Sequence, residues 1–313
     1  VLAFGLLALV GLSLSKGPVR IDFFHMDDLQ REIILRVRLP RVLLSGLVGA
    51  ALSVSGVLFQ YVMKNPLADS FTTGVSSSAA LGAVLAILIG GHHLVPLMGL
   101  LGGLAGLWFV YRVASYRGTV EPLTMLLAGI VVSTFGSACI SLIKYLSDEG
   151  VSAIVFWLMG GFQNASLERV GIFSFVLALS FVFLQKRALG LDIIAFDETT
   201  ARSSGLDVDR LRKEAFFFGT LLTAVSVGYA GIIGFVGLIV PHLLRLLGFV
   251  RAKDLLGLSA LAGAGFMVLN DLVARTILPQ GQELPVGIIT SSLGGAFFLY
   301  LLITKKRQLY GID

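Results

Sequence analysis

Four arginines are the side chains of this sequence with the clearest potential for chemistry. Arg36, Arg38 and Arg41 stand together just before a long apolar stretch, and Arg275 follows another apolar stretch near the C-terminus. A guanidinium group is a planar fork of N–H donors that pairs with a carboxylate or phosphate through parallel hydrogen bonds. The cluster therefore indicates docking of an acidic partner or an anionic solute, with anchoring to lipid phosphates as the alternative.

The stretch after Arg41 has to hold this cluster in place, and it has the character of a membrane-spanning helix. It carries no charged residue between Arg41 and Lys64. As a helix, this uncharged stretch is long enough to cross the ~30 Å hydrocarbon core of a bilayer. Small residues recur along it every three or four positions, at Ser45, Gly49, Ser53 and Gly56. Residues with this spacing share one helix face and let a second helix approach closely.

Composition places the whole chain among polytopic membrane proteins. Its 313 residues are 56% hydrophobic and 14% charged, with a mean hydropathy of +0.90. A soluble domain of this length carries far more charge. No charged segment precedes the first apolar residues and no cleavage pattern follows them, so we expect the end of a first transmembrane helix there, rather than a signal peptide.

Apolar runs bounded by charges or turn residues predict about ten spans. They fall near residues 1–15, 42–63, 71–90, 94–113, 122–146, 168–185, 214–231, 232–249, 255–274 and 285–304. The apolar piece Ser152–Phe162 is too short to cross and is expected to be interfacial or re-entrant. We therefore predict an all-α integral membrane fold, with residues 1–313 forming a single transmembrane domain. Spans two to five and seven to ten enter the membrane in opposite directions, which is the pattern of an inverted repeat.

Lysine and arginine placement predicts the orientation, because cytoplasmic loops are enriched in both. With a cytoplasmic N-terminus, one face receives most of the basic residues: Lys64, Arg112, Arg117, the loop Lys186–Lys213, Arg245, Arg251, Lys253 and the tail Lys305–Arg307. Arg36, Arg38 and Arg41 then lie on the outer face, against this rule. An exception of this kind needs another reason, which favours a docking role.

The polar inner loop at residues 191–214 is the second candidate site. Asp197 and Glu198 precede a polar run, and Gly205 interrupts it. The pattern predicts a short amphipathic helix, a glycine turn and a second short helix leading into span seven. Such a loop is either a contact surface for a peripheral subunit or an ordinary connection. No G-x-x-x-x-G-K-[ST] motif occurs, so the chain does not hydrolyse nucleotide by a P-loop mechanism.

Small, weakly polar residues form a third pattern. In span five they occur at Gly129, Ser133, Ser137 and Ser141, and in span ten at Ser291 and Ser292. These residues either line a wide translocation pathway or form a helix-packing face.

Other chemistry is not predicted. The single cysteine, Cys139, excludes a disulfide scaffold and a thiolate metal cluster. The four histidines, His25, His92, His93 and His242, are scattered and lack the spacing of metal ligands. No arrangement of nucleophile and base is present, so we expect neither a catalytic nor a metal site.

Several motifs occur in order along the chain: RLPR at 38–41, LVGAALSVSG at 47–56, Gln60, NPLAD at 65–69, GV at 74–75, WLMGG at 157–161, GFVGLIVPHLLR at 234–245, D-x-x-A-R at 271–275 and ELPVGIIT at 283–290. Together they resemble the membrane-spanning permease subunits of the iron-chelate and vitamin B12 importers, a branch of the binding-protein-dependent ABC transporters. The resemblance implies a type II ABC importer permease fold with ten transmembrane helices. It also implies a homodimer, two ATP-binding subunits on the inner side and a soluble binding protein outside.

The resemblance also implies roles for particular residues. Arg38, Arg41 and Arg275 would meet acidic residues of the binding protein. Glu198, Ala201, Gly205 and Leu206 would face the ATPase, and spans five and ten would flank the pathway. The chain departs from the family pattern at Ser204, where a leucine is usual, and at Ala296, where a proline is frequent.

The resemblance implies an importer subunit for a metal chelate, such as a ferric siderophore, haem or cobalamin, in a bacterial or archaeal cytoplasmic membrane. It also implies oxyanion uptake as the role of a smaller branch. ATP and Mg²⁺ would bind the partner subunits, and no cofactor or nucleic acid is expected on this chain. The alternative is an ion- or proton-coupled secondary transporter, which needs a titratable residue at the midplane. The uncharged spans argue against a secondary transporter. A third alternative, a membrane scaffold without transport, is compatible with the sequence.

Overall fold

The structure is a computed structural model that describes residues 2–17, 27–116, 119–147, 151–279 and 282–310. The predicted all-α architecture is confirmed. Its elements are α1 (Leu2–Ser15), α2 (Asp28–Glu32), the π-helix η1 (Ile33–Arg38), α3 (Leu39–Val62), α4 (Val75–Leu88), the 3₁₀-helix η2 (His92–Leu94), α5 (Val95–Ala114), β1 (Ser115–Tyr116), β2 (Thr119–Val120), α6 (Pro122–Leu146), α7 (Val151–Leu158), α8 (Leu167–Phe196), α9 (Glu198–Ser203), α10 (Val208–Ala230), α11 (Val236–Leu246), α12 (Ala252–Thr276) and α13 (Val286–Tyr310).

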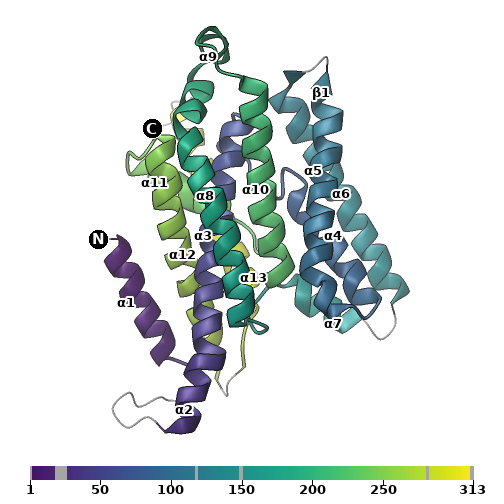
Figure 1. The fold of residues 1–313 in the computed structure, drawn as a ribbon, viewed down its shortest axis with the longest axis vertical. Coiled ribbons are helices and arrows are strands. Elements are labelled where there is room, and N and C mark those ends of the chain that lie inside the picture. Colours follow the sequence, from purple (N-terminus) through teal and green to yellow (C-terminus); the bar gives the residue numbers. More distant parts are fainter. Residues whose placement is uncertain (1, 18–26, 117–118, 148–150, 280–281, 311–313) are drawn as a thin grey trace.

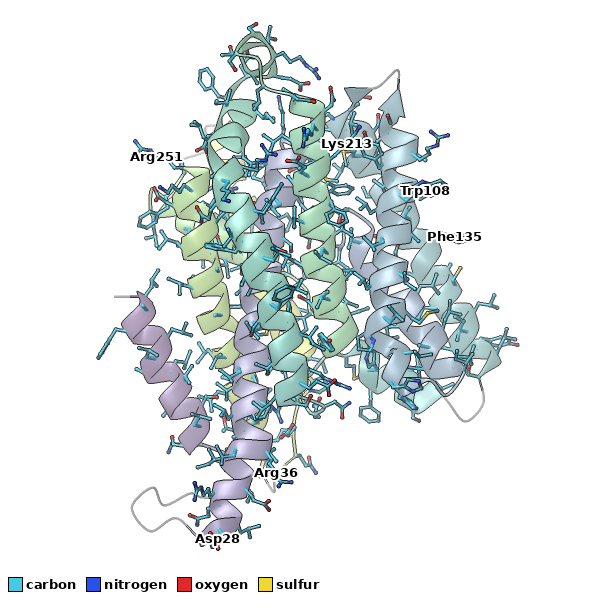
Figure 2. The ribbon with its side chains drawn as sticks, in the orientation of Figure 1. Asp28, Arg36, Trp108, Phe135, Lys213 and Arg251 are labelled. Atoms are coloured by element: carbon cyan, nitrogen blue, oxygen red, sulfur yellow. The ribbon has the colours of Figure 1, made fainter. Side chains whose placement is uncertain are left out.

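The long helices run along one common direction, and the bundle has two distinct ends. α9 and β1 lie at one end, and α2 and α7 lie at the other (Figure 1). Arg36 lies near the α2 end, whereas Lys213 and Arg251 lie nearer the α9 end (Figure 2). Within the described residues, five helical segments are long and apolar enough to cross a membrane. The molecule is therefore a multi-pass membrane protein, with the predicted outer and inner clusters at opposite ends.

Helix α3 is the central element, because other helices surround it on every side. It packs against α12, α10, α11 and α8, and nearly all of its residues are buried. The predicted small-residue face is what permits this packing. A Cβ atom at Gly49 would lie 2.2 Å from the carbonyl oxygen of Gly263 in α12, and one at Gly56 would lie 1.9 Å from that of Gly237 in α11.

The helix that contains the RLPR segment is longer than predicted. α2, η1 and α3 form one continuous helical run from Asp28 to Val62, whereas the predicted span began at residue 42. Pro40 has no N–H to donate within the run. The π-helical turn just before it, in which Leu39 N donates to Ile34 O, widens the helix and accommodates this interruption.

The eighth predicted span, at 232–249, is corrected by the structure. The helix there covers only the eleven residues of α11, about 16 Å at 1.5 Å per residue. The chain between Ala230 and Val236 is non-helical and mostly buried, as irregular backbone at membrane depth must be. Hydrogen bonds from Gly161 N to Ala230 O and from Val286 N to Gly160 O hold this segment. Three of the recognised motifs, WLMGG, GFVG and ELPVG, therefore meet at one junction.

Two further boundaries differ from the prediction. α8 continues to Phe196, eleven residues past the predicted end, because no proline interrupts it before Asp197. α10 starts at Val208, where Asp207 accepts a hydrogen bond from Arg210 N as its cap. The second short helix expected before span seven is thus the first part of α10 itself. The short helix α7 is present as predicted, and the internal repeat stays a prediction.

Candidate partner-contact sites

A buried ion-pair cluster occupies the end of the bundle near α2. The carboxylate of Asp271 in α12 is fully buried and contacts two arginines. Its Oδ1 lies 2.9 Å from Arg41 Nη2, and its Oδ2 lies 3.1 Å from Arg275 Nε. Both carboxylate oxygens of Glu283 accept hydrogen bonds of 2.9 Å from Arg41 Nη1. Arg41 therefore already has two carboxylate partners within its own chain.

The other two arginines of the cluster hold helix α1. Arg275 donates to Ser13 Oγ at 2.6 Å. Arg38 donates to the carbonyl oxygens of Leu14 at 2.8 Å and Ser15 at 3.1 Å. Arg275 thus comes together in space with Arg38 and Arg41, although it is more than 230 positions away from them in the sequence.

The structure corrects the expected exposure of the arginines that were predicted to dock a partner. Arg38, Arg41 and Arg275 are each at most 6% exposed, because carboxylates and carbonyls of the same chain are within reach at the helix ends. Their contact with a binding protein stays a prediction. The exposed member of the original group is Arg36, whose side chain is 79% exposed and, among the described residues, forms an ion pair of 3.2 Å with Glu32 one turn away.

The inner loop contains the predicted short helix, α9, and its capping is complete. At the N-terminus, Asp197 accepts a hydrogen bond of 2.6 Å from Thr200 N, and hydrogen bonding to Thr200 lowers the pKa of this carboxyl. At the C-terminus, Leu206 N donates to Ala201 O and Gly205 N donates to Arg202 O, each at 3.1 Å. This is a Schellman motif, and Gly205 has the φ of +82° that the motif requires.

Glu198, the first residue of α9, connects this helix to the rest of the bundle. Its Oε1 accepts from Arg202 Nη2 at 2.9 Å, its Oε2 accepts from Arg212 Nη2 at 3.0 Å, and Lys64 Nζ lies 3.7 Å away. Partial burial would raise the pKa of Glu198, but hydrogen bonds from Arg202 and Arg212 outweigh it and hold the pKa below its ordinary value. The carboxylate is therefore charged at neutral pH and ties α9 to α10 and to the segment just after α3.

The four residues predicted to face the ATPase lie at one place but differ in exposure. Gly205 is exposed, Glu198 and Leu206 are partly buried, and Ala201 is fully buried. Ala201 therefore packs inside the chain, since the short helix turns this face towards the bundle. The sequence reasoning overlooked Phe196, which ends α8 and is 88% exposed. A phenylalanine beside a run of polar residues was the available signal.

A cleft of about 300 Å³ opens beside the end of α8, close to α9. Its lining residues are Gln60, Tyr61, Lys64, Asn65, Pro66, Ala195, Arg245 and Val250. Within it, Arg245 donates to Gln60 Oε1 and Gln60 Nε2 donates to Gly237 O at 3.1 Å. Gln60 and Arg245, both in recognised motifs, thus join α3 to α11.

The small-residue stripe of α6 is divided between packing and exposure. A Cβ atom at Gly129 would lie 2.3 Å from Thr72 O, and Ser133 Oγ donates to Phe71 O at 2.5 Å. Further along, Ser137 and Ser141 are exposed. Ser291 and Ser292 of α13 are exposed as well. The packing interpretation therefore holds for the first half of the stripe, and the second half is accessible in the single chain.

Metal binding has no support from the described part of the chain. It contains no group of three or more histidine, cysteine, aspartate or glutamate residues placed to hold a metal ion. His25 lies outside the described residues.

Comparison with known proteins identifies the family. The profile of the FecCD transport family matches residues 4–304, almost the entire chain. The chain belongs to the FecCD transport family. This membership makes it the membrane-spanning permease subunit of an ABC importer, as the motifs predicted.

Individual FecCD relatives agree with this assignment. The cobalamin import system permease BtuC of Halobacterium salinarum is 36% identical over 90% of this chain and 76% of its own length. The molybdate import system permease MolB of Haemophilus influenzae is also 36% identical, over 90% of this chain and 84% of its own. A metal-chelate type ABC transporter solved in an inward-facing conformation has a TM-score of 0.88 at 34% identity, covering 97% of both chains.

The FecCD motifs also contain the residues that the sequence reasoning missed. Asp271 stands one helical turn before Arg275 in the D-x-x-A-R segment, a spacing that allows an ion pair between them. Glu283 opens the ELPVGIIT segment. The two carboxylates were therefore visible as charged residues inside motifs, although their convergence on Arg41 depends on the folding of α3 against α12.

Proposed function

We propose that two copies of this chain assemble with two ATP-binding subunits and a soluble binding protein, in the cytoplasmic membrane of a bacterium or archaeon, to import a metal chelate. Ferric siderophores, haem and cobalamin are the proposed solutes. ATP and Mg²⁺ would bind the partner subunits, with no cofactor on this chain. FecCD membership and the similarity to a cobalamin permease support this proposal.

One observation carries the proposal. α9 projects beyond the bundle at one end, and Arg36 lies at the opposite end (Figures 1 and 2). A permease of this class needs one surface for an ATPase and one for a binding protein, on opposite sides of the membrane. The segment from Phe196 to Leu206, which includes Glu198, Ala201 and Gly205, is the proposed ATPase contact. Ala201 would act there only by packing α9 in place.

The solute pathway would run between the two copies. The exposed small residues Ser137, Ser141, Ser291 and Ser292 are suitable for such a lining, because they leave room and offer only weak hydrogen bonds. Gly129 and Ser133 would position the pathway helix α6 by packing. The molybdate relative is as similar as the cobalamin relative, so the solute has to be found by uptake measurements.

Reconstitution in liposomes tests the proposal. The chain would be combined with its ATPase and binding protein, and uptake of cobalamin, haem, a ferric siderophore and molybdate would be measured in parallel. We expect uptake of one chelate that requires ATP and both partners. Uptake that persists without the ATPase and follows an ion gradient would instead identify a secondary transporter.

A charge reversal tests the docking surface. Arg36→Glu should weaken capture of the binding protein, and the loss should depend on salt because surface charges are screened. Arg251→Glu is the matched control, since Arg251 is also exposed but lies at the other end (Figure 2). Equal capture by both variants would contradict docking at Arg36. Arg38, Arg41 and Arg275 are proposed to shape this surface, and charge reversal there would instead disrupt the buried cluster.

A further inference from the structure

A single buried arginine connects α9 to the pathway helix α6. Arg212, near the start of α10, is 2% exposed. Its Nη2 donates to Glu198 Oε2 at 3.0 Å, and its Nη1 donates to the carbonyl oxygen of Val120 at 2.8 Å. One guanidinium group therefore contacts the first residue of α9 and the last residue of β2.

Val120 lies two residues before the start of α6, so the two can move together. Val120 is 3% exposed and pairs with Ser115 across the β1–β2 ribbon. Glu121 N donates to Ala114 O at 3.3 Å, and Pro122 begins α6. Because the ribbon and the proline restrict the backbone here, a displacement of Val120 displaces the start of α6.

Arginine is suited to hold both partners at once. Its planar fork fixes the two N–H directions relative to each other, and charge-assisted hydrogen bonds are about twice as strong as neutral ones. A lysine has a single ammonium group, so it cannot hold both oxygens in the same fixed geometry.

We propose that Arg212 is a positioning residue that transmits movement of α9 to α6. This inference deepens the proposed function and rests on it, since it requires α9 to be moved by an ATPase. A push on α9 shifts Glu198, Glu198 shifts Arg212, and Arg212 shifts Val120 and the first turn of α6. The exposed serines of α6 then move relative to the second copy, which changes the width of the pathway.

The test measures uptake and ATP hydrolysis together in the reconstituted complex. Arg212→Lys keeps the charge without the fork, and Arg212→Gln removes the charge. We expect both variants to assemble with the ATPase and to hydrolyse ATP, while the solute imported per ATP falls about tenfold, the usual size of a coupling between two sites. Arg187→Gln is the matched control, because Arg187 forms an ion pair of 3.0 Å with Glu214 that does not involve α9 or β2. It should import as much solute per ATP as the unchanged chain.

The possible results distinguish a failure of the proposed role of Arg212 from a failure of the proposed importer function. Unchanged import per ATP in Arg212→Lys and Arg212→Gln would overturn the role of Arg212. If Arg212→Gln does not assemble, Arg212→Lys decides. Absence of ATP-dependent uptake in the unchanged complex would instead contradict the proposed function.

A spin label on α6 at Leu123, which is 61% exposed, gives an independent readout. Its ATP-driven displacement should disappear in Arg212→Lys and persist in Arg187→Gln.

Discussion

Arg41 of α3 and Asp271 of α12 are 230 positions apart in the sequence and form a buried ion pair of 2.9 Å. The Asp271 side chain has no exposure to solvent, and Arg275 approaches its other oxygen. A buried pair contributes little net stability compared with apolar packing, but loss of one partner leaves an uncompensated charge. The pair therefore makes the contact between α3 and α12 dependent on both partners being present.

Asp271→Asn should destabilise the protein by about 3–5 kcal/mol, because two buried arginines lose their shared counter-charge. The free energy of unfolding in mixed detergent micelles measures this change. Glu32→Gln is the matched control: its pair with Arg36 is exposed, and such pairs are worth about 0–1 kcal/mol. Similar losses in the two variants would show that the Asp271 carboxylate is not buried as described.

Gly56→Ala should destabilise the contact between α3 and α11. The new methyl group would lie 1.9 Å from Gly237 O, and backbone cannot yield as a flexible side chain does. Overpacking of this kind costs about 1–3 kcal/mol or more. Gly171→Ala in α8 is the control, since no atom lies within 4 Å of its added Cβ; it should stabilise the helix by up to about 1 kcal/mol. Unfolding midpoints of the two variants that shift in the same direction would contradict the close packing.

The small-residue face of α3 was predictable from the sequence because helical periodicity alone brings such residues to one side. The same reasoning predicted the spans other than the eighth, where only the short helix α11 forms, and the glycine turn at Gly205. Each of these features depends on residues a few positions apart. The local spacing of residues was therefore sufficient to predict both the helical architecture and the position of α9.

The pairing of the arginines was not predictable in the same way. Arg41 meets Asp271 and Glu283 only after α3 has packed against α12 and the following loop has returned to it. Likewise, the contact between Arg212 and Val120 joins residues 92 positions apart. Charge counting could place the arginines at one end, but it could not distinguish a free guanidinium from one already held by a carboxylate.

Phe196→Ala should weaken assembly with the ATPase. Phe196 is the large exposed side chain next to α9, and an aromatic anchor of an interface contributes about 2 kcal/mol, or roughly a 30-fold change in affinity. Phe175→Ala is the control, because Phe175 lies on the same helix and is 70% exposed, but is far from α9. Titration of the detergent-purified chain with its ATPase measures both affinities. Equal affinities would remove Phe196 from the proposed contact.

The attachment of α9 should respond to pH only under acidic conditions. The pKa of Glu198 is lowered in the folded chain, so its contribution is fully present above the ordinary value of 4.5 and is lost as the pH falls through the lower folded value. Amide exchange of α9, corrected for the intrinsic rate, should therefore be constant from pH 8 to pH 6. Loss of protection within that range would contradict the described pairing of Glu198 with Arg202 and Arg212.

Gly205→Ala should impair coupling between ATP hydrolysis and transport without affecting capture of the binding protein. Gly205 closes α9 at a φ of +82° with open space around it, so the methyl group causes backbone strain rather than a clash. An alanine in this conformation costs about 1–2 kcal/mol, enough to loosen a helix of six residues. Gly248→Ala is the control, since its φ of +92° and open surroundings are similar but it lies between α11 and α12. Binding-protein-stimulated hydrolysis should fall in Gly205→Ala and stay normal in Gly248→Ala; normal stimulation in both variants would exclude the end of α9 from coupling.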